Sequence, residues 1–165
     1  MFGSANLAQD QLALANLFVS RQEFLSKYPS GLTLDQFVDA LIATITNDDG
    51  VDQTSQRNAL IALGSRGAVM YRLASDDLAG GNGGISNRAF IDAEYNRAFV
   101  SSQYFGYLRR DGDIGGLLFW LGQVNSAALR DVNKQHAMVC SFLTSAEYQL
   151  RFSSVVTHSN AECPQ

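Results

Sequence analysis

The chain has 165 residues, of which 46% are hydrophobic and 17% charged, and its formal net charge is -4. This composition supplies enough apolar material for a sizeable core and excludes an intrinsically disordered chain. The acidic balance disfavours nucleic acid or an anionic membrane as a partner, because dense Lys and Arg patches bind both, and no basic run exceeds Arg109-Arg110. No apolar run reaches the roughly 18 residues of a membrane-spanning helix, so we expect no membrane insertion.

Apolar residues recur at spacings of three and four over residues 6–28 and predict one helix there. Thr33 predicts the N-cap of a second helix, which ends at an Asp-rich turn closed by Gly50. Two short helices are expected next, the first of them capped by Asp52 or Thr54.

The Gly-rich run at residues 79–86 predicts a linker. Glycines can also form a phosphate-binding loop, but such a loop follows a strand, and the residues before this run predict a helix. Ser86 then predicts the N-cap of a long helix from Asn87 to about Arg109.

The most distinctive stretch runs from Tyr104 to Leu121, where a charged turn joins two aromatic helices. Its centre begins like a calcium loop, but Gly115 and Gly122 stand where that loop needs oxygen ligands. We therefore expect Asp113 to cap the second helix. Asp111 and Asp113 are the candidate ligands for a calcium ion, and no cofactor is expected.

The helix after this turn carries apolar residues that we expect to pack as core, namely Leu117, Leu118, Trp120 and Leu121. A binding platform for sugars or peptides made from Tyr107, Phe119 and Trp120 is the alternative. Two further helices are predicted, over residues 129–142 and 144–152.

Cys140 and Cys163 leave two alternatives open. Cys140 would be a buried free thiol beside an unrelated tail thiol, or the two would form a disulfide, which an oxidising compartment permits and which would add about 3 kcal/mol of stability. His136 lies one helical turn before Cys140, but no residue is evident to orient it, so a Cys/His nucleophile is not expected.

The helix ends contain a repeated pattern. Residues 18–28 match residues 142–152, with the acid, the aromatics and the final cation in register, and residues 73–78 form a fainter copy. This pattern predicts helical units that pack on their neighbours. The expected divisions are an N-terminal helix ending a preceding unit (1–32), a degenerate unit (33–78), the Gly-rich linker (79–86), a fuller unit (87–152) and a tail (153–165). The natural protein is then expected to extend further in the N-terminal direction.

Two linked motifs carry a family resemblance. They are Tyr107-Leu108-Arg109-Arg110, Asp113, Gly116-Leu117 and Phe119-Trp120-Leu121, followed by Phe142-Leu143-Thr144-Ser145-Ala146-Glu147-Tyr148 and Arg151-Phe152. Together, over about residues 99–152, they resemble the bacterial family called domain of unknown function 4214. Gly112 departs from the proline usual in that family.

The resemblance implies an all-helical domain, similar in style to phycobilisome linker domains, within long secreted or surface proteins. No catalytic residues are established for the family, so the resemblance assigns none to this chain. Arg110, Asp113, Gly116 and Trp120 are expected to organise the second unit, with Glu147 and Arg151 holding its closing helix.

These observations predict an all-α fold of two unequal helical repeat units, packed as a multi-helix bundle without significant sheet. The expected function is a non-catalytic structural or interaction module of a secreted or cell-surface bacterial protein, with a protein or a cell-surface glycan as partner. The alternative is a calcium- or carbohydrate-binding module that uses the Asp111–Asp113 turn and its neighbouring aromatics. The oligomeric state stays open.

Overall fold

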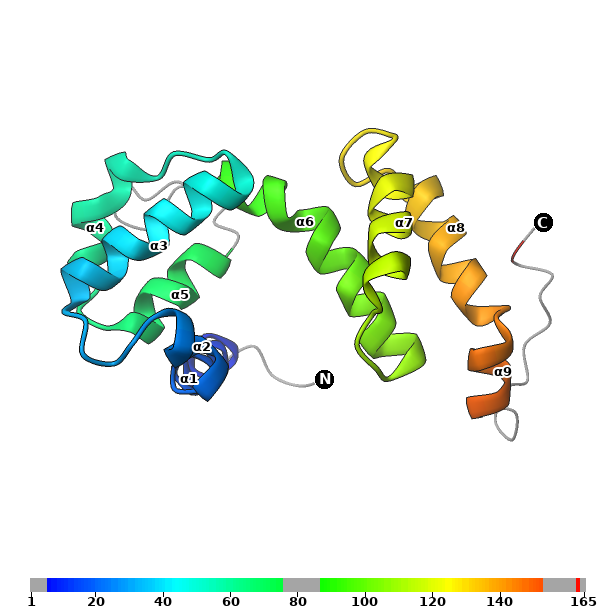
Figure 1. The fold of residues 1–165 in the computed structure, drawn as a ribbon, viewed down its shortest axis with the longest axis horizontal. Coiled ribbons are helices and arrows are strands. Elements are labelled where there is room, and N and C mark those ends of the chain that lie inside the picture. The colour runs from blue at the N-terminus through cyan, green and yellow to red at the C-terminus, as the bar shows by residue number, and fades with distance from the viewer. Residues whose placement is uncertain (1–5, 76–86, 153–162, 164–165) are drawn as a thin grey trace. The chain divides into compact units, whose positions relative to one another are not determined.

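The computed structural model describes residues 6–75, 87–152 and Cys163. Within those residues the fold is all-helical, with nine α-helices and no strand (Figure 1), which confirms the predicted fold class. The chain divides into two compact units, Met1–Ala93 (unit 1) and Glu94–Gln165 (unit 2). The expected linker at residues 79–86 lies outside the described residues, and the division itself falls later, within a helix.

Unit 1 contains five α-helices and the beginning of a sixth. They are α1 (Leu7–Val19), α2 (Gln22–Lys27), α3 (Leu34–Asp49), α4 (Arg57–Ile61), preceded by the 3-10 turn η1 (Thr54–Gln56), α5 (Arg66–Ala74) and the start of α6 (Arg88–Gln103). The expectation of a single helix over residues 6–28 is wrong. The helix breaks at Ser20, whose hydroxyl donates to the Leu17 carbonyl at 2.7 Å, and Arg21 then takes an extended conformation.

The start and end of α3 follow from its cap residues. The Thr33 hydroxyl accepts from the Gln36 N–H at 3.3 Å, and the Gln36 side chain accepts from the Thr33 N–H at 2.9 Å. This reciprocal pair satisfies two N–H groups that the first turn leaves free. Gly50 ends the helix at a φ of 68°, a left-handed conformation that glycine adopts without strain. The predicted cap is therefore confirmed.

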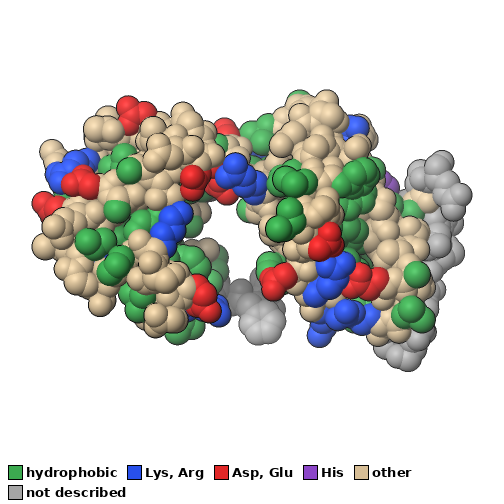
Figure 2. Space-filling view, viewed as in Figure 1, with side chains coloured by type: hydrophobic (Ala, Val, Ile, Leu, Met, Phe, Trp, Pro, Cys, Tyr) green, Lys and Arg blue, Asp and Glu red, His purple; other side chains and the backbone are tan. Residues whose placement is uncertain are grey.

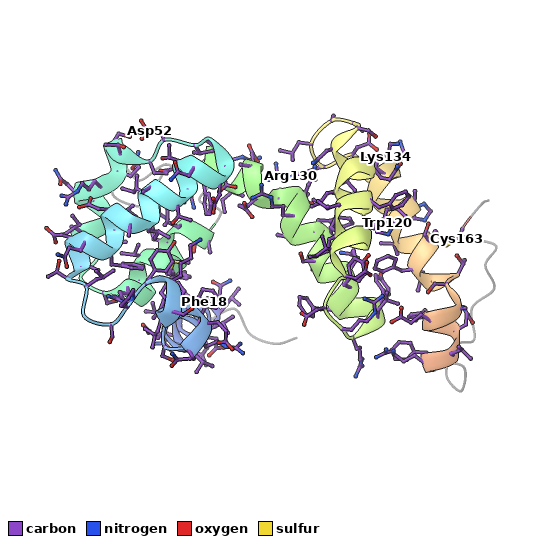
Figure 3. The ribbon with its side chains drawn as sticks, viewed as in Figure 1. Phe18, Asp52, Trp120, Arg130, Lys134 and Cys163 are labelled. Carbon is purple, nitrogen blue, oxygen red and sulfur yellow. A yellow bond between two sulfur atoms is a disulfide. The ribbon has the colours of Figure 1, made fainter. Side chains whose placement is uncertain are left out.

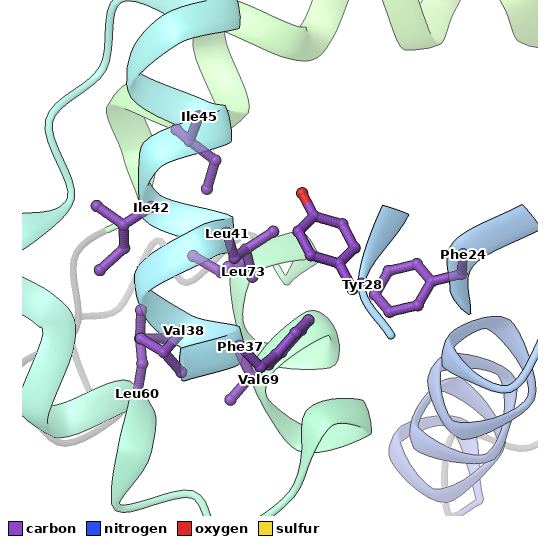
Figure 4. Packing of buried hydrophobic residues seen from close by; sticks show 10 residues of the cluster. All are labelled: Phe24, Tyr28, Phe37, Val38, Leu41, Ile42, Ile45, Leu60, Val69 and Leu73. Carbon is purple, nitrogen blue, oxygen red and sulfur yellow. The ribbon is translucent and has the colours of Figure 1, made fainter. Parts of the chain in front are cut away.

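The core of unit 1 forms where α3 meets α2 and α5 (Figure 4). Three rings meet there, with Phe24 and Tyr28 at 6.0 and 5.5 Å from Phe37 between ring centroids. The Arg66 guanidinium lies 4.9 Å from the Phe37 ring and donates to the Tyr28 carbonyl at 2.9 Å. Residues 1–32 and 33–78, expected as separate units, thus share one core in their described parts.

Unit 2 continues α6 into one turn of π-helix, η2 (Tyr104–Leu108), followed by α7 (Ile114–Asn125), α8 (Val132–Leu143) and α9 (Ala146–Phe152). The expected start of α8 at Leu129 is wrong, because Asp131 caps the helix by accepting from the Lys134 N–H at 2.9 Å. The core gathers the apolar faces of these helices, namely Val100, Tyr104, Leu108, Val124, Met138 and Phe142.

Among the described residues, none of the helices combines the length and the hydropathy that crossing a bilayer would require.

Candidate functional site

The turn between η2 and α7 carries most of the residues singled out in the sequence. Arg109 ends the helix at a φ of 50°, and the chain then turns so that Asp113 becomes the N-cap of α7. The Asp113 carboxylate accepts from the Gly116 N–H at 2.8 Å, as the sequence predicts. The helix N-terminus also favours a negative charge at this position.

Arg110 connects this turn to the last helix. Its guanidinium donates two hydrogen bonds to the Glu147 carboxylate, at 2.7 and 2.9 Å. A third bond goes to the Asp111 carbonyl at 2.8 Å, while the Asp113 carboxylate lies at 3.7 Å and completes the ion pairs. Arg151 approaches Glu147 at 3.5 Å from within α9. We name these four side chains, Arg110, Asp113, Glu147 and Arg151, the arginine clamp.

The clamp lowers the pKa of its two carboxylates, Asp113 and Glu147. The hydrogen bonds from Arg110 hold the pKa of Glu147 below its ordinary value. The Gly116 N–H lowers the pKa of Asp113 in the same way, because hydrogen bonds to a carboxylate favour its charged form. Figure 2 shows side chains of both charges gathered where α7 begins and α9 lies. The charged forms of Asp113 and Glu147 are thus stabilised at neutral pH.

Two glycines permit the close packing of the turn. A side chain at Gly116 would collide with the Tyr104 hydroxyl and would approach the Asp113 carboxylate at 3.1 Å. One at Gly112 would come within 2.6 Å of the Leu117 side chain. Glycine at these positions therefore leaves the space that Tyr104 and Leu117 fill.

The aromatic residues divide between core and surface. Tyr104 packs edge-on against Phe142 with ring centroids 4.9 Å apart, and Trp120 (labelled in Figure 3) meets the same ring at 5.9 Å. Tyr107 packs against Tyr148 at 6.2 Å. Of the three residues considered as a platform, only Phe119 and Trp120 contact each other, at 5.1 Å, while Tyr107 faces α9.

The expectation that Leu118 belongs to the core is wrong, because its side chain is exposed. It follows Leu117 directly along α7, and adjacent helical residues point about 100° apart, so the two cannot share one buried face. Phe119 is exposed as well, and its ring contacts that of Trp120.

The same turn contains the two carboxylates, Asp111 and Asp113, that could bind a metal ion. Asp113 already caps α7 and faces Arg110, and Asp111 is exposed. Within residues 6–75, 87–152 and Cys163, no group of three or more His, Cys, Asp or Glu side chains is arranged to hold a metal ion.

Cys140 and Cys163 are joined in a disulfide, with their Cα atoms 5.3 Å apart. The bond ties the end of the chain to α8. His136 lies 3.5 Å from the Cys140 sulfur, one helical turn away. Because this sulfur is already bonded to another, the pair does not present a thiolate nucleophile.

Sequence reasoning missed two of the contacts between the motifs. The pairing of Arg110 with Glu147 joins positions 37 residues apart, and Tyr107 meets Tyr148 across the same junction. The signal that could have found them is the link between the two family motifs, since an arginine in one and an acid in the other invite an ion pair.

Unit 1 has a pocket of its own, with a volume of about 530 Å³. It opens beside the junction of α1 and α2 and is lined by Phe18, Arg21, Glu23, Phe24, Lys27, Tyr28, Leu41 and Met70. Lys27 approaches Asp48 at 3.7 Å, and Arg21 approaches Glu23 at the same distance. The pocket thus has an aromatic floor and an exposed charged rim.

Comparison with known families gives one match. Residues 73–152 match the family described as Domain of unknown function (DUF4214). The match begins in α5, earlier than the expected start near residue 99, and ends with α9, so it includes the turn and the whole arginine clamp. No curated protein and no solved structure gives a significant match to the chain. Residues 73–152, slightly under half of the chain, are thus similar to the DUF4214 family.

Proposed function

We propose that this chain is a non-catalytic structural or interaction module of a secreted or cell-surface bacterial protein. The observation that carries the proposal is the two-pronged bond between Arg110 and Glu147. The charged groups of the two family motifs pair with each other, and this pair joins the η2–α7 turn to α9. Motif residues that pair with each other in this way stabilise a scaffold that carries the surrounding surface.

The other motif residues support the same interpretation. Asp113 is used as a helix cap, and the glycine at 116 makes room for Tyr104. Trp120 fills the space beside Phe142. Each feature stabilises the fold by capping, close packing or ring contact.

The disulfide supports the proposed compartment. Disulfides persist in oxidising environments such as the periplasm, the cell surface and the extracellular space, and are rare where thiols are kept reduced. Cys140 and Cys163 form such a bond in the fold. Labelling of free thiols on the denatured, unreduced protein, taken directly from its native compartment, checks this. Two reactive thiols per chain would count against a secreted or surface location.

The experiment that tests the proposed role combines stability with calorimetry on the full chain. Arg110→Ala should lower the unfolding midpoint by removing the bond to Glu147. Arg21→Ala is the matched control, because Arg21 lies 3.7 Å from Glu23 with both side chains more than half exposed, and we expect little change there.

The rival calcium- or carbohydrate-binding role makes the opposite prediction. Titration of the chain with millimolar calcium, and separately with oligosaccharides, should give no heat of binding if the module is a scaffold. Heat with calcium that disappears in the Asp111→Asn, Asp113→Asn variant would overturn the proposal in favour of a calcium module. Heat with an oligosaccharide that disappears in Phe119→Ala would favour a carbohydrate module.

A further inference from the structure

The hairpin formed by α1 and α2 has a counterpart in α8 and α9. Each residue of the α1–α2 hairpin corresponds to the residue of the α8–α9 hairpin that lies 124 positions later. Phe18 thus corresponds to Phe142, and Tyr28 to Phe152. The first helices end at corresponding residues, Val19 and Leu143, and the second helices begin at corresponding residues, Gln22 and Ala146. The register found in the sequence therefore extends to the helix boundaries.

The details of the two breaks also correspond. The Arg21 N–H donates to the Phe18 carbonyl at 3.2 Å, and the Ser145 N–H donates to the Phe142 carbonyl at 3.1 Å. The ring pairs match too, with Phe24 and Tyr28 at 5.0 Å and a tilt of 40°, and Tyr148 and Phe152 at 4.8 Å and 45°. The same local structure is thus built twice.

In unit 2 this hairpin is covered by the turn before α7. Tyr104 covers Phe142, Tyr107 covers Tyr148, and the Arg109 guanidinium lies 5.7 Å from the Phe152 ring. Arg110 binds Glu147. One turn thus supplies a partner to four residues of the hairpin.

In unit 1 the corresponding residues surround the pocket. Phe18, Glu23, Phe24 and Tyr28, the counterparts of those four residues, all line it. Tyr28 and Phe24 gain cover on one side from Phe37, and Phe18, labelled in Figure 3, touches only Phe24 among the ring contacts of the described residues. The pocket therefore occupies the place that the turn fills in unit 2.

Exposure measures the missing cover. Phe18 is 46% exposed where Phe142 is 5%, and Leu14 is 66% exposed where Met138 is 0%. The Glu23 side chain is 81% exposed where that of Glu147 is 36%. The opposite side of α1 is already occupied, because Asn16 lies against Gly67 of α5. The uncovered side is thus the one that faces the turn in unit 2.

We propose that this surface, formed by Leu14, Phe18, Glu23 and the pocket, binds the helix-turn-helix of another DUF4214 domain. The incoming turn places its arginine on Glu23 and its tyrosine rings on Phe18 and Phe24. The proposal rests on the interaction role given above and names the partner as a protein hairpin with one arginine and an aromatic face.

One charge of the pocket rim, Glu23, agrees with that partner, while Arg21 and Lys27 are the cations of the rim. Among the described residues, Glu23 pairs with Arg21 at 3.7 Å, and both side chains are more than half exposed. An ion pair of this kind contributes little, so an incoming guanidinium that binds both carboxylate oxygens, as Arg110 does, can replace it. Burial of Phe18 and Leu14 would remove apolar surface from water at the same time.

The test extends the full chain with a second copy of its own hairpin. A copy of residues 94–130 is fused in front of Met1, so that residues 1–6 lengthen the connection to α1, at little entropic cost. Covalent linkage gives the copied turn a high effective concentration at α1. Hydrogen exchange with mass spectrometry then follows peptides from residues 7–28, which occur once in the fusion. We expect exchange there to slow at least about tenfold relative to the unfused chain. A tenfold change corresponds to a gain of about 1.4 kcal/mol in the free energy of opening.

Charge reversal makes the test specific. Arg110→Glu in the copied segment should abolish the slowing, and Glu23→Arg in the chain that carries this reversed copy should restore it. Phe18→Asp should also abolish the slowing, whereas Leu150→Asp, at an exposed leucine of α9, should not. Restoration by the double reversal shows that the variants still fold.

Three results would overturn the proposal. Exchange in residues 7–28 unchanged by the fusion would do so, as would a slowing that survives both Phe18→Asp and the single charge reversal. The third is a dimer of the unfused chain, measured by sedimentation velocity, that dissociates in the Phe18→Asp variant. The surface would then bind a second copy of this chain. None of these results depends on the calcium and oligosaccharide titrations, so the scaffold role is tested separately.

Discussion

The two helical hairpins, α1–α2 and α8–α9, have similar backbone conformations, but different segments of the chain surround them. Both break after a helix that ends in a Ser or Thr cap, and both stack two rings along the second helix. Yet Phe142 is buried by a turn that reaches it from earlier in unit 2, whereas Phe18 borders an open pocket. Local sequence therefore sets the hairpin, and a distant segment decides which of its side chains are core.

The second faces of the hairpins differ as well. Asn16 lies against Gly67 of α5, so a neighbouring helix covers α1 there. Its counterpart, Cys140, is held by a disulfide to Cys163 near the end of the chain. One position is thus covered by helix packing in unit 1 and by a covalent link in unit 2.

The largest predicted effect is the contrast between Phe142 and Phe18. Phe142→Ala should destabilise unit 2 by about 3 to 5 kcal/mol, because it leaves a cavity between Tyr104 and Trp120. Phe18→Ala should destabilise unit 1 by about 1 kcal/mol or less, since nearly half of that side chain is already in water. Fluorescence of the single tryptophan, Trp120, reports on unit 2, and hydrogen exchange of residues 7–28 reports on unit 1. Equal losses at both positions would contradict the comparison.

Loss of the disulfide is predicted to come next. Opening a link between residues 23 apart in sequence should cost about 3 kcal/mol through the freedom gained by the unfolded chain. Denaturant unfolding of unit 2, followed by Trp120 fluorescence with and without reductant, measures this cost. Cys163→Ser should reproduce the effect without reductant, and the exchange of residues 7–28 in unit 1 should not change.

Substitution of two glycines in α7 should act in opposite directions. Gly116→Ala places a methyl group against the Tyr104 hydroxyl and should destabilise unit 2 by about 1 to 3 kcal/mol. Gly122→Ala meets no atom within 4 Å and should stabilise the helix by about 0.5 to 1 kcal/mol. Unfolding midpoints from Trp120 fluorescence compare the two variants. A stabilised Gly116→Ala protein would show that Tyr104 does not pack against the turn as described.

The smallest predicted effect is a pH dependence that belongs to Glu147. Because Arg110 lowers the pKa of Glu147 in the folded chain, this residue adds stability above its unfolded pKa of about 4.3 and loses it as the pH falls through the lowered value. The loss should be about 1 kcal/mol, since a third of the side chain faces solvent.

Glu147→Gln removes this contribution, so the difference in unfolding free energy between wild type and variant should be present at pH 7 and shrink below pH of about 4. Glu23→Gln is the matched variant in the first hairpin, and its effect at pH 7 should stay within a few tenths of a kcal/mol. A Glu147→Gln difference that grew in acid would have the wrong sign for the pair with Arg110.

Much of the fold could be predicted from the sequence because its signals are local. The Thr33 and Asp113 caps, the Gly50 terminus and the helical class all depend on residues within a turn or two of one another. The break at Ser20 was missed because the apolar spacing continues across it, and spacing alone does not register a hydroxyl that bonds the carbonyl three residues back.

The candidate site was predictable in its members and less so in its contacts. Arg110, Asp113 and Glu147 are singled out by the motifs, but the motifs do not say which carboxylate pairs with Arg110. The main partner is Glu147, brought there by the packing of α9 beside η2. Leu118 was wrongly expected in the core, and the role of Phe119 was left open. The reason is the same, because which residues of α7 are buried depends on the segments that pack against it.

The sequence by itself determined the helices, their caps and the repeated hairpin, since hydrogen bonds and apolar spacing within a few residues specify them. Only the tertiary structure decided that one copy of the hairpin is covered by an arginine-bearing turn and the other is left open. The physical reason is that burial and ion pairing depend on which distant segment arrives. Residues as similar as Phe18 and Phe142 therefore have different environments.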